Sequence, residues 1–137
     1  MNQSELKFHA DSVSKKIDNA LKDKEYFSYP YQHIILDDFL EDSFINVIHD
    51  SFPDLDNSQW EHSNDEGIEI KSRTNWTSEF DIPEGIVDAI RVFNSAPILK
   101  AISNRLDIPK LIPDPYFTGG GLNITPKNGL LDVHVDG

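Results

Sequence analysis

The stretch PKLIPDPYFTGGGLNITPKNGLLDVHVDG, residues 109–137, differs in character from the rest of the chain and decides the expected fold. Prolines and three consecutive glycines precede two segments, 121–125 and 130–136, in which apolar and polar residues alternate. Alternation of this kind favours β-strands. The Pro-Lys-Asn-Gly sequence between the two segments predicts a turn, and therefore a β-hairpin. Because a two-stranded ribbon is marginal in water, the hairpin is expected to belong to a larger sheet.

The chain before this stretch is expected to be mainly helical. Apolar residues recur at helical spacing over 11–24, from Asp42 to a stop at Pro53, and in two successive helices within 83–106. Residues 31–36 and 67–71 have the composition of short strands. The expected fold class is therefore α+β, with the helices first and the β-rich part last.

Composition and charge exclude several classes of protein. With 38% hydrophobic and 26% charged residues among 137, the chain has the composition of a soluble globular protein. Its formal net charge of −12 would repel a phosphate backbone, so no nucleic-acid partner is expected. No apolar stretch is long enough to cross a membrane. Cysteine is absent, which excludes disulfides and thiolate metal sites and fits a cytoplasmic location.

His134 and Asp136 are the candidate metal ligands. Residues two apart on a strand project from the same face, so an imidazole and a carboxylate can converge there on one ion. This donor pair suits Fe(II) in oxygenases, which use one further histidine and leave coordination positions open. His9-Ala10-Asp11 has the same spacing, but it lies where a helix is expected to begin. We therefore interpret His9 as a surface residue and Asp11 as a helix cap.

Residues 111–136, LIPDPYFTGGGLNITPKNGLLDVHVD, resemble the prolyl 4-hydroxylase-like branch of the 2-oxoglutarate and Fe(II)-dependent oxygenase superfamily. In that branch a glycine-rich strand, a turn ending in glycine and the pattern L-x-x-H-x-D follow in this order. The resemblance implies a double-stranded β-helix, or jelly roll. Residues 109–137 would form its first core strands and 1–108 a helix-rich N-terminal region, within a single domain that is incomplete over 1–137.

The resemblance also implies a hydroxylase-type dioxygenase that uses Fe(II), with 2-oxoglutarate as cosubstrate and ascorbate as a candidate reductant. His134 and Asp136 would supply two of the three iron ligands. The third histidine, and the arginine or lysine that binds 2-oxoglutarate, are expected after Gly137, so weak or no catalysis is expected of this chain alone. Asn123, where family members often carry histidine, is the candidate cosubstrate contact. The expected substrate is a small molecule or a peptidyl group.

Two alternatives remain open, and no feature of the sequence indicates an oligomeric state. The chain could be a non-catalytic jelly-roll module for structure or binding, in which His134 and Asp136 merely occupy a strand. It could also be a zinc hydrolase that combines this pair with other histidines. The glycine run 119–121 is not followed by the lysine and the helix start of a phosphate-binding loop. It predicts close strand packing or a bulge instead.

Overall fold

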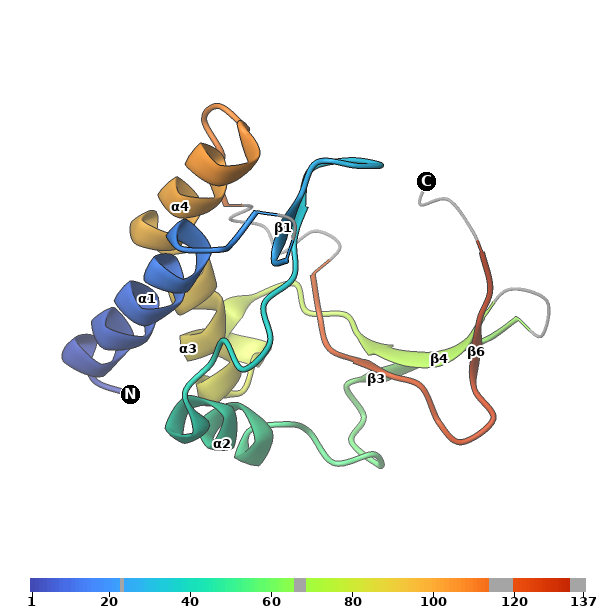
Figure 1. Cartoon of the computed structure of the whole chain (residues 1–137). Coiled ribbons are helices and arrows are strands. Elements are labelled where there is room, and N and C mark those ends of the chain that lie inside the picture. The colour runs from blue at the N-terminus through green and yellow to red at the C-terminus, as the bar shows by residue number, and fades with distance from the viewer. Residues whose placement is uncertain (23, 66–68, 114–119, 134–137) are drawn as a thin grey trace. The chain divides into compact units, whose positions relative to one another are not determined.

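The computed structural model describes residues 1–22, 24–65, 69–113 and 120–133 (Figure 1). The chain divides into two compact units. Unit 1 comprises Met1–Phe52 and Pro83–Pro113, and unit 2 comprises Pro53–Ile82 and Asp114–Gly137. Within the described ranges, unit 1 holds the α-helices and a two-stranded sheet, whereas unit 2 holds the remaining strands. The expected α+β class is thus confirmed.

The helices and strands have the following bounds. Unit 1 contains α1 (Gln3–Asp18), β1 (Tyr26–Phe27), β2 (His33–Ile34), α2 (Asp42–Asp50), α3 (Glu84–Phe93) and α4 (Ala96–Leu106). Unit 2 contains β3 (Trp60–Asp65), β4 (Glu69–Thr74), the 3-10 helix η1 (Glu79–Asp81), β5 (Asn123–Ile124) and β6 (Leu130–Leu131). The helix beginning at Asp42 and the two helices within 83–106 are confirmed. None of the helices in the described parts is both long and apolar enough to span a bilayer.

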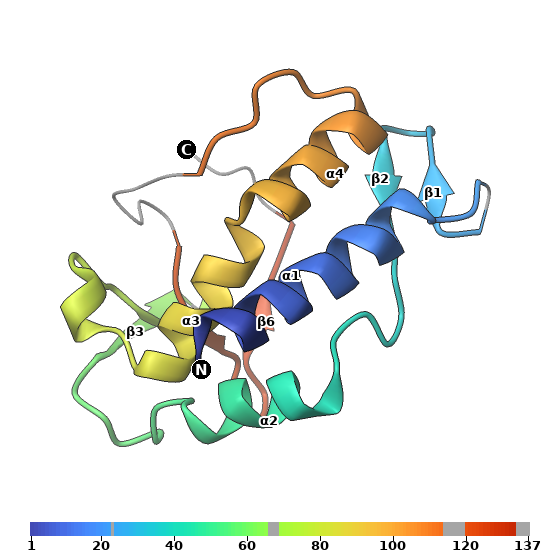
Figure 2. The same ribbon diagram turned by 90° about the vertical axis from the view of Figure 1, so that its left-hand side faces the viewer.

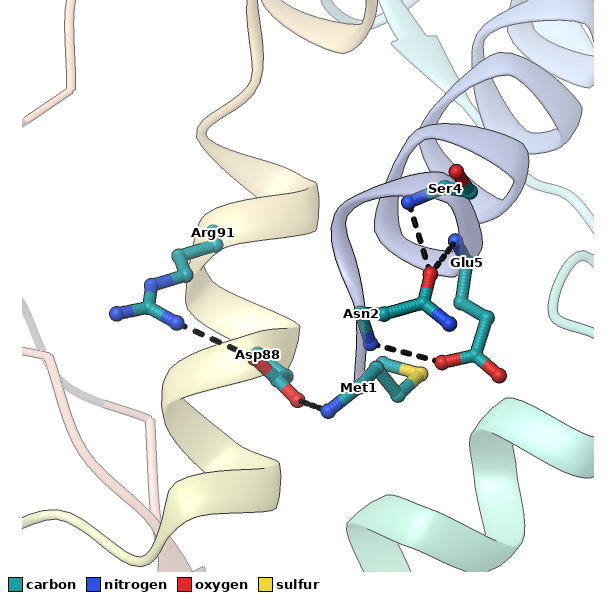
Figure 3. Close-up of polar contacts among 6 residues, drawn as sticks. All are labelled: Met1, Asn2, Ser4, Glu5, Asp88 and Arg91. Carbon is teal, nitrogen blue, oxygen red and sulfur yellow. Dashed lines mark hydrogen bonds and ion pairs between the residues drawn. The ribbon is translucent and has the colours of Figure 1, made fainter.

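Helix α1 begins eight residues earlier than the sequence predicted, at Gln3 instead of Asp11. A capping box sets this start (Figure 3): the Asn2 side chain accepts hydrogen bonds from the backbone N–H groups of Ser4 and Glu5, at 2.9 and 3.0 Å. The Glu5 carboxylate in turn accepts from the Asn2 N–H at 2.8 Å. These bonds satisfy N–H groups that lack partners within the helix. The cap, and not the first strongly apolar position, therefore decides where the helix begins.

The early start of α1 also overturns the interpretation of His9 and Asp11. His9 is buried, with 5% of its surface exposed, and its ring stacks on Phe44 of α2 with centroids 4.5 Å apart. Asp11 lies inside α1 and forms an ion pair with Lys7 one turn earlier. The predictions of a surface histidine and a helix cap were both wrong, because the helix already exists at these positions and turns His9 toward α2.

The core of unit 1 forms where α1 packs along α4 and α3, and where α2 packs on α3 (Figure 2). Phe44, Val92 and Ile98 are almost completely buried there. Burial of a side chain of this size contributes about 1.5–3 kcal/mol relative to its exposure. The strand predicted over 31–36 is shorter than expected, since β2 spans only His33–Ile34, paired antiparallel with β1.

The sheet of unit 2 is centred on β4. Strand β3 pairs with β4 in an antiparallel hairpin, with Trp60 opposite Thr74. Strands β5 and β6 also pair antiparallel with β4, in registers that place Ile124 opposite Ser72 and Leu130 opposite Ile70. The two segments expected to pair with each other therefore run in the same direction along β4. The predicted hairpin was wrong in this respect.

Segments 121–125 and 130–131 instead act as one interrupted strand. Ile124 and Leu130 are six positions apart, whereas their partners on β4 are two apart, so four extra residues lie in the loop between them. Because four is an even number, the alternation of side chains continues across the loop and Ile124 and Leu130 share a face of the sheet. Local turn chemistry cannot distinguish such a loop from a hairpin turn, since both use Pro, Asn and Gly.

Candidate functional site

The predicted iron ligands His134 and Asp136 lie outside the described residues, the last of which is Val133. The structure does describe the chain that leads to them. Strand β6 pairs with the first residues of β4, Glu69 and Ile70. The strand expected over 130–136 is thus confirmed at Leu130–Leu131, and it ends there within the described residues, since Asp132 and Val133 are not strand.

The interrupted strand contacts the end of β4 closely at Gly121 and Thr74. Thr74 is 3% exposed; its backbone N–H donates to the carbonyl of Leu122 at 3.0 Å, and its Oγ1 accepts from the Leu122 N–H at 2.9 Å. A Cβ atom at Gly121 would lie 2.7 Å from the Thr74 carbonyl oxygen, closer than any side chain can approach. The prediction of close strand packing for the glycine run is confirmed at Gly121.

One face of the sheet carries charged side chains, and Asn123 belongs to it. Asn123 is exposed and lies directly opposite Arg73, so both side chains project from the same face. The Arg73 guanidinium lies 3.7 Å from a Glu61 carboxylate oxygen, and Asn75 donates to the other Glu61 oxygen at 2.9 Å. Exposed ion pairs of this kind are weak.

The other face carries a histidine–serine pair that the sequence did not indicate. The Nδ1 atom of His62 on β3 lies 2.7 Å from Ser72 Oγ on β4, and these residues are direct partners in the register. Ile124 lies opposite Ser72, so this face also receives the apolar side chains of the interrupted strand, Ile124 and Leu130. Ten residues separate His62 from Ser72. Only the β3–β4 register, which spacing alone does not reveal, brings them together.

The structure does not gather the remaining histidines around a common point. No group of three or more His, Asp or Glu side chains suited to a metal ion occurs among the residues that the structure describes. His33 donates its Nδ1–H to the Tyr31 carbonyl at 2.9 Å, and His49 projects into solvent beside Asp50. Among the described residues, the predicted iron site is therefore represented only by the sheet that contains β6, the strand that precedes His134 in the sequence.

Cavities of unit 1 are lined by residues of that unit. A cavity of about 550 Å³ is lined by apolar side chains of α1, α3, α4 and the segment 34–39, together with Gln32 and His33. A second cavity, of about 400 Å³, lies at the start of α1 against α2 and is lined by Met1, Phe8 and His9 among others. Neither contains Asn123 or the residues of β6.

Comparison with known proteins adds no family to this description. A scan against protein-family models found no match to the chain, and searches of curated proteins and of solved structures found none either.

Proposed function

We propose that the chain is the N-terminal part of an Fe(II)- and 2-oxoglutarate-dependent dioxygenase of the hydroxylase type, with His134 and Asp136 as iron ligands. The observation that carries this proposal is the interrupted strand. Strands β5 and β6 run along one edge of β4, and β6 ends three positions before His134 in the sequence. A jelly roll is built from antiparallel strands, and all strand pairs among the described residues are antiparallel. We take this sheet to be the beginning of such a fold.

The donor set of the candidate site fits Fe(II). A neutral imidazole and an ionised carboxylate, separated by one residue, are two of the three protein ligands of non-haem iron oxygenases. Iron held there would bring together dioxygen, which is the oxidant, and 2-oxoglutarate: one oxygen atom would enter the C–H bond of the substrate and the other the succinate formed as CO2 leaves. His134 must lose its proton to coordinate, so metal affinity is expected to fall in acid. Two ligands hold a divalent ion weakly, and the chain is therefore expected to bind metal poorly without the third histidine.

Asn123 was the candidate contact for the cosubstrate, and its exposed amide can donate a hydrogen bond to a carboxylate. Asn123 and Arg73, however, project from the face of the sheet opposite to that of Ile124 and Leu130. On the strand expected over 130–136, positions 134 and 136 would share the face of Leu130. Asn123 is therefore left out of the proposed iron site, and the far carboxylate of 2-oxoglutarate is expected to require a basic residue after Gly137.

Metal binding tests the proposal. Mn(II), which can replace Fe(II) without oxidation, would be titrated by electron paramagnetic resonance into this chain and into a longer version that carries the expected third histidine. We expect weak binding by the chain. The longer version should bind more tightly, and more tightly still when 2-oxoglutarate is present. His134→Ala and Asp136→Ala should each weaken binding by about tenfold or more.

The matched controls are His49→Ala and Asp50→Ala, because both side chains project into solvent in unit 1. These variants should bind Mn(II) like the parent protein. His9→Ala is unsuitable as a control, since His9 is buried in the core. If Asp136→Ala leaves Mn(II) affinity unchanged, or if 2-oxoglutarate has no effect on the longer version, the oxygenase assignment fails. The non-catalytic jelly-roll module would then account better for the chain.

A further inference from the structure

A buried carboxylate in α3 contacts the first residue of the chain. Asp88 is 1% exposed, and its Oδ2 atom lies 2.5 Å from the α-amino nitrogen of Met1 (Figure 3). Its other oxygen, Oδ1, lies 3.4 Å from Nη1 of Arg91, one turn further along the same helix. No other hydrogen bond or ion pair of Asp88 occurs in the described parts of the chain. The contact to Met1 joins segments 87 residues apart.

The two cations beside Asp88 are not equivalent. The Arg91 side chain is 63% exposed, so water screens its charge. The α-ammonium nitrogen of Met1 lies 2.5 Å from the carboxylate, compared with 3.4 Å for the guanidinium, and its largest interaction is the hydrogen bond to Asp88. A carboxylate that is removed from water is costly unless a charge and hydrogen bonds compensate it. The α-ammonium group of Met1 is therefore the main partner of the buried Asp88 charge.

The capping box of α1 explains why Met1 reaches α3. Hydrogen bonds between Asn2 and Glu5 fix the backbone at Asn2, immediately after the amino group. Helix α1 itself packs against α3. The capping box thus orients Met1 toward α3 independently of the ion pair. Little additional conformational entropy is therefore lost when the ion pair forms.

We propose that the α-amino group of Met1 is a modification-sensitive site, at which a formyl or acetyl group, or a preceding residue, destabilises unit 1 by leaving the Asp88 charge unpaired. An acylated nitrogen is neutral and has a single N–H, so it can retain one hydrogen bond at most. A steric clash is not required, because the cavity of about 400 Å³ beside Met1 offers space for a small group.

The test compares three forms of the full chain: with a free Met1 amine, with Nα-acetyl-Met1, and with Gly-Ser placed before Met1. Each form is confirmed by mass spectrometry and made in the parent, Asp88→Asn and Asp18→Asn backgrounds. Asp18 is the matched control because it is an exposed aspartate at the far end of α1. Thermal unfolding is followed by ellipticity at 222 nm. In the parent and in Asp18→Asn, both changes should lower the midpoint by several degrees.

In Asp88→Asn the same two changes should shift the midpoint far less, because no buried charge is left unpaired. Equal shifts in the parent and in Asp88→Asn would overturn the proposal, as would the absence of a shift in the parent.

A second measurement does not depend on the folding of Asp88→Asn. Brief reaction of the free-amine chain with acetic anhydride near neutral pH is followed by peptide mass spectrometry. The rate of reaction of the Met1 amine relative to that of the exposed lysines should be lower in the folded chain than in urea. The same relative rate in both conditions would also overturn the proposal.

Discussion

The ion pair between Met1 and Asp88 makes the free energy of unfolding of unit 1 depend on pH, because the Met1 amino group must be protonated for the pair to form. The hydrogen bond to Asp88 is the main cause that raises the pKa of the Met1 α-amino group above its ordinary value near 8; desolvation opposes it, and the negative charge of Asp88 adds to it. The folded state therefore holds this proton more tightly than the unfolded chain does. Its stabilisation is fully present below about pH 8 and is lost as the pH rises through the higher pKa of the folded state.

This linkage predicts a difference between the parent and Asp88→Asn in alkaline solution. As the pH rises above about 8, the midpoint of thermal unfolding of the parent should fall more steeply than that of Asp88→Asn. Lysines and tyrosines begin to titrate in the same range, but they do so in both proteins and cancel in the comparison. Ellipticity at 222 nm and constant ionic strength suffice for the measurement. Parallel curves for the two proteins would show that the amino group contributes no pH dependence.

Single residues also show where the sequence prediction stopped. His9-x-Asp11 and His134-x-Asp136 have the same spacing. The first pair was rejected as a metal site because a helix was expected to begin there. The contact that decides the environment of His9 is its stack on Phe44, which lies 35 positions away in the sequence. A spacing rule cannot detect such a contact. The pairing of His62 with Ser72 was missed for the same reason, because it depends on the register of two strands.

Among the elements, helices were predicted better than strands. Two successive helices within 83–106 and the start near Asp42 followed from apolar spacing and from prolines, which are local signals. The exception was α1, whose capping box lies ahead of the apolar repeat. Strands depend on partners elsewhere in the chain. Strand β3 was not predicted at all, and the two segments taken as a hairpin turned out to share β4 as their partner.

The interrupted strand makes a testable prediction about its loop. Deletion of the four residues 126–129 would place Leu130 directly after Thr125, and so opposite Ile70 in one continuous register with Ile124 opposite Ser72. Unit 2 should therefore still fold, with the fluorescence of the buried Trp60 and Trp76 unchanged in emission maximum. A loop that connected two mutually paired strands could not be removed in this way.

The control for this deletion is removal of three residues, 126–128, which is an odd number. This deletion would shift the register by one residue, so that Leu130 and Leu131 would each project from the face of the sheet that the other occupies now. We expect this variant to lose the pairing of β6 with β4, seen as faster amide hydrogen exchange at Leu130 and Leu131. If both deletions abolish the tryptophan signal of the folded state, the loop is required for unit 2 and the interpretation as an interrupted strand fails.

At the scale of the whole molecule, the two units carry separate spectroscopic reporters. The four α-helices of the described ranges all belong to unit 1, so ellipticity at 222 nm reports chiefly on that unit. Both tryptophans of the chain, Trp60 and Trp76, belong to unit 2 and are 6% exposed. Tryptophan fluorescence therefore reports on unit 2 alone. Each unit also has its own buried polar contact, Asp88 with Met1 in unit 1 and Thr74 with Leu122 in unit 2.

This division predicts that variants in one unit affect the two signals unequally. Thr74→Val removes the acceptor of the partly buried Leu122 N–H, at a cost of about 1 kcal/mol, and should lower the urea midpoint seen by fluorescence more than that seen by ellipticity. Asp88→Asn should do the reverse. Thr74→Ser, which retains the hydroxyl acceptor, is the matched control and should shift the fluorescence midpoint less than Thr74→Val. If each variant moves both curves by the same amount, the chain unfolds as one cooperative body, and the two units are not separate in energy although each has its own contacts.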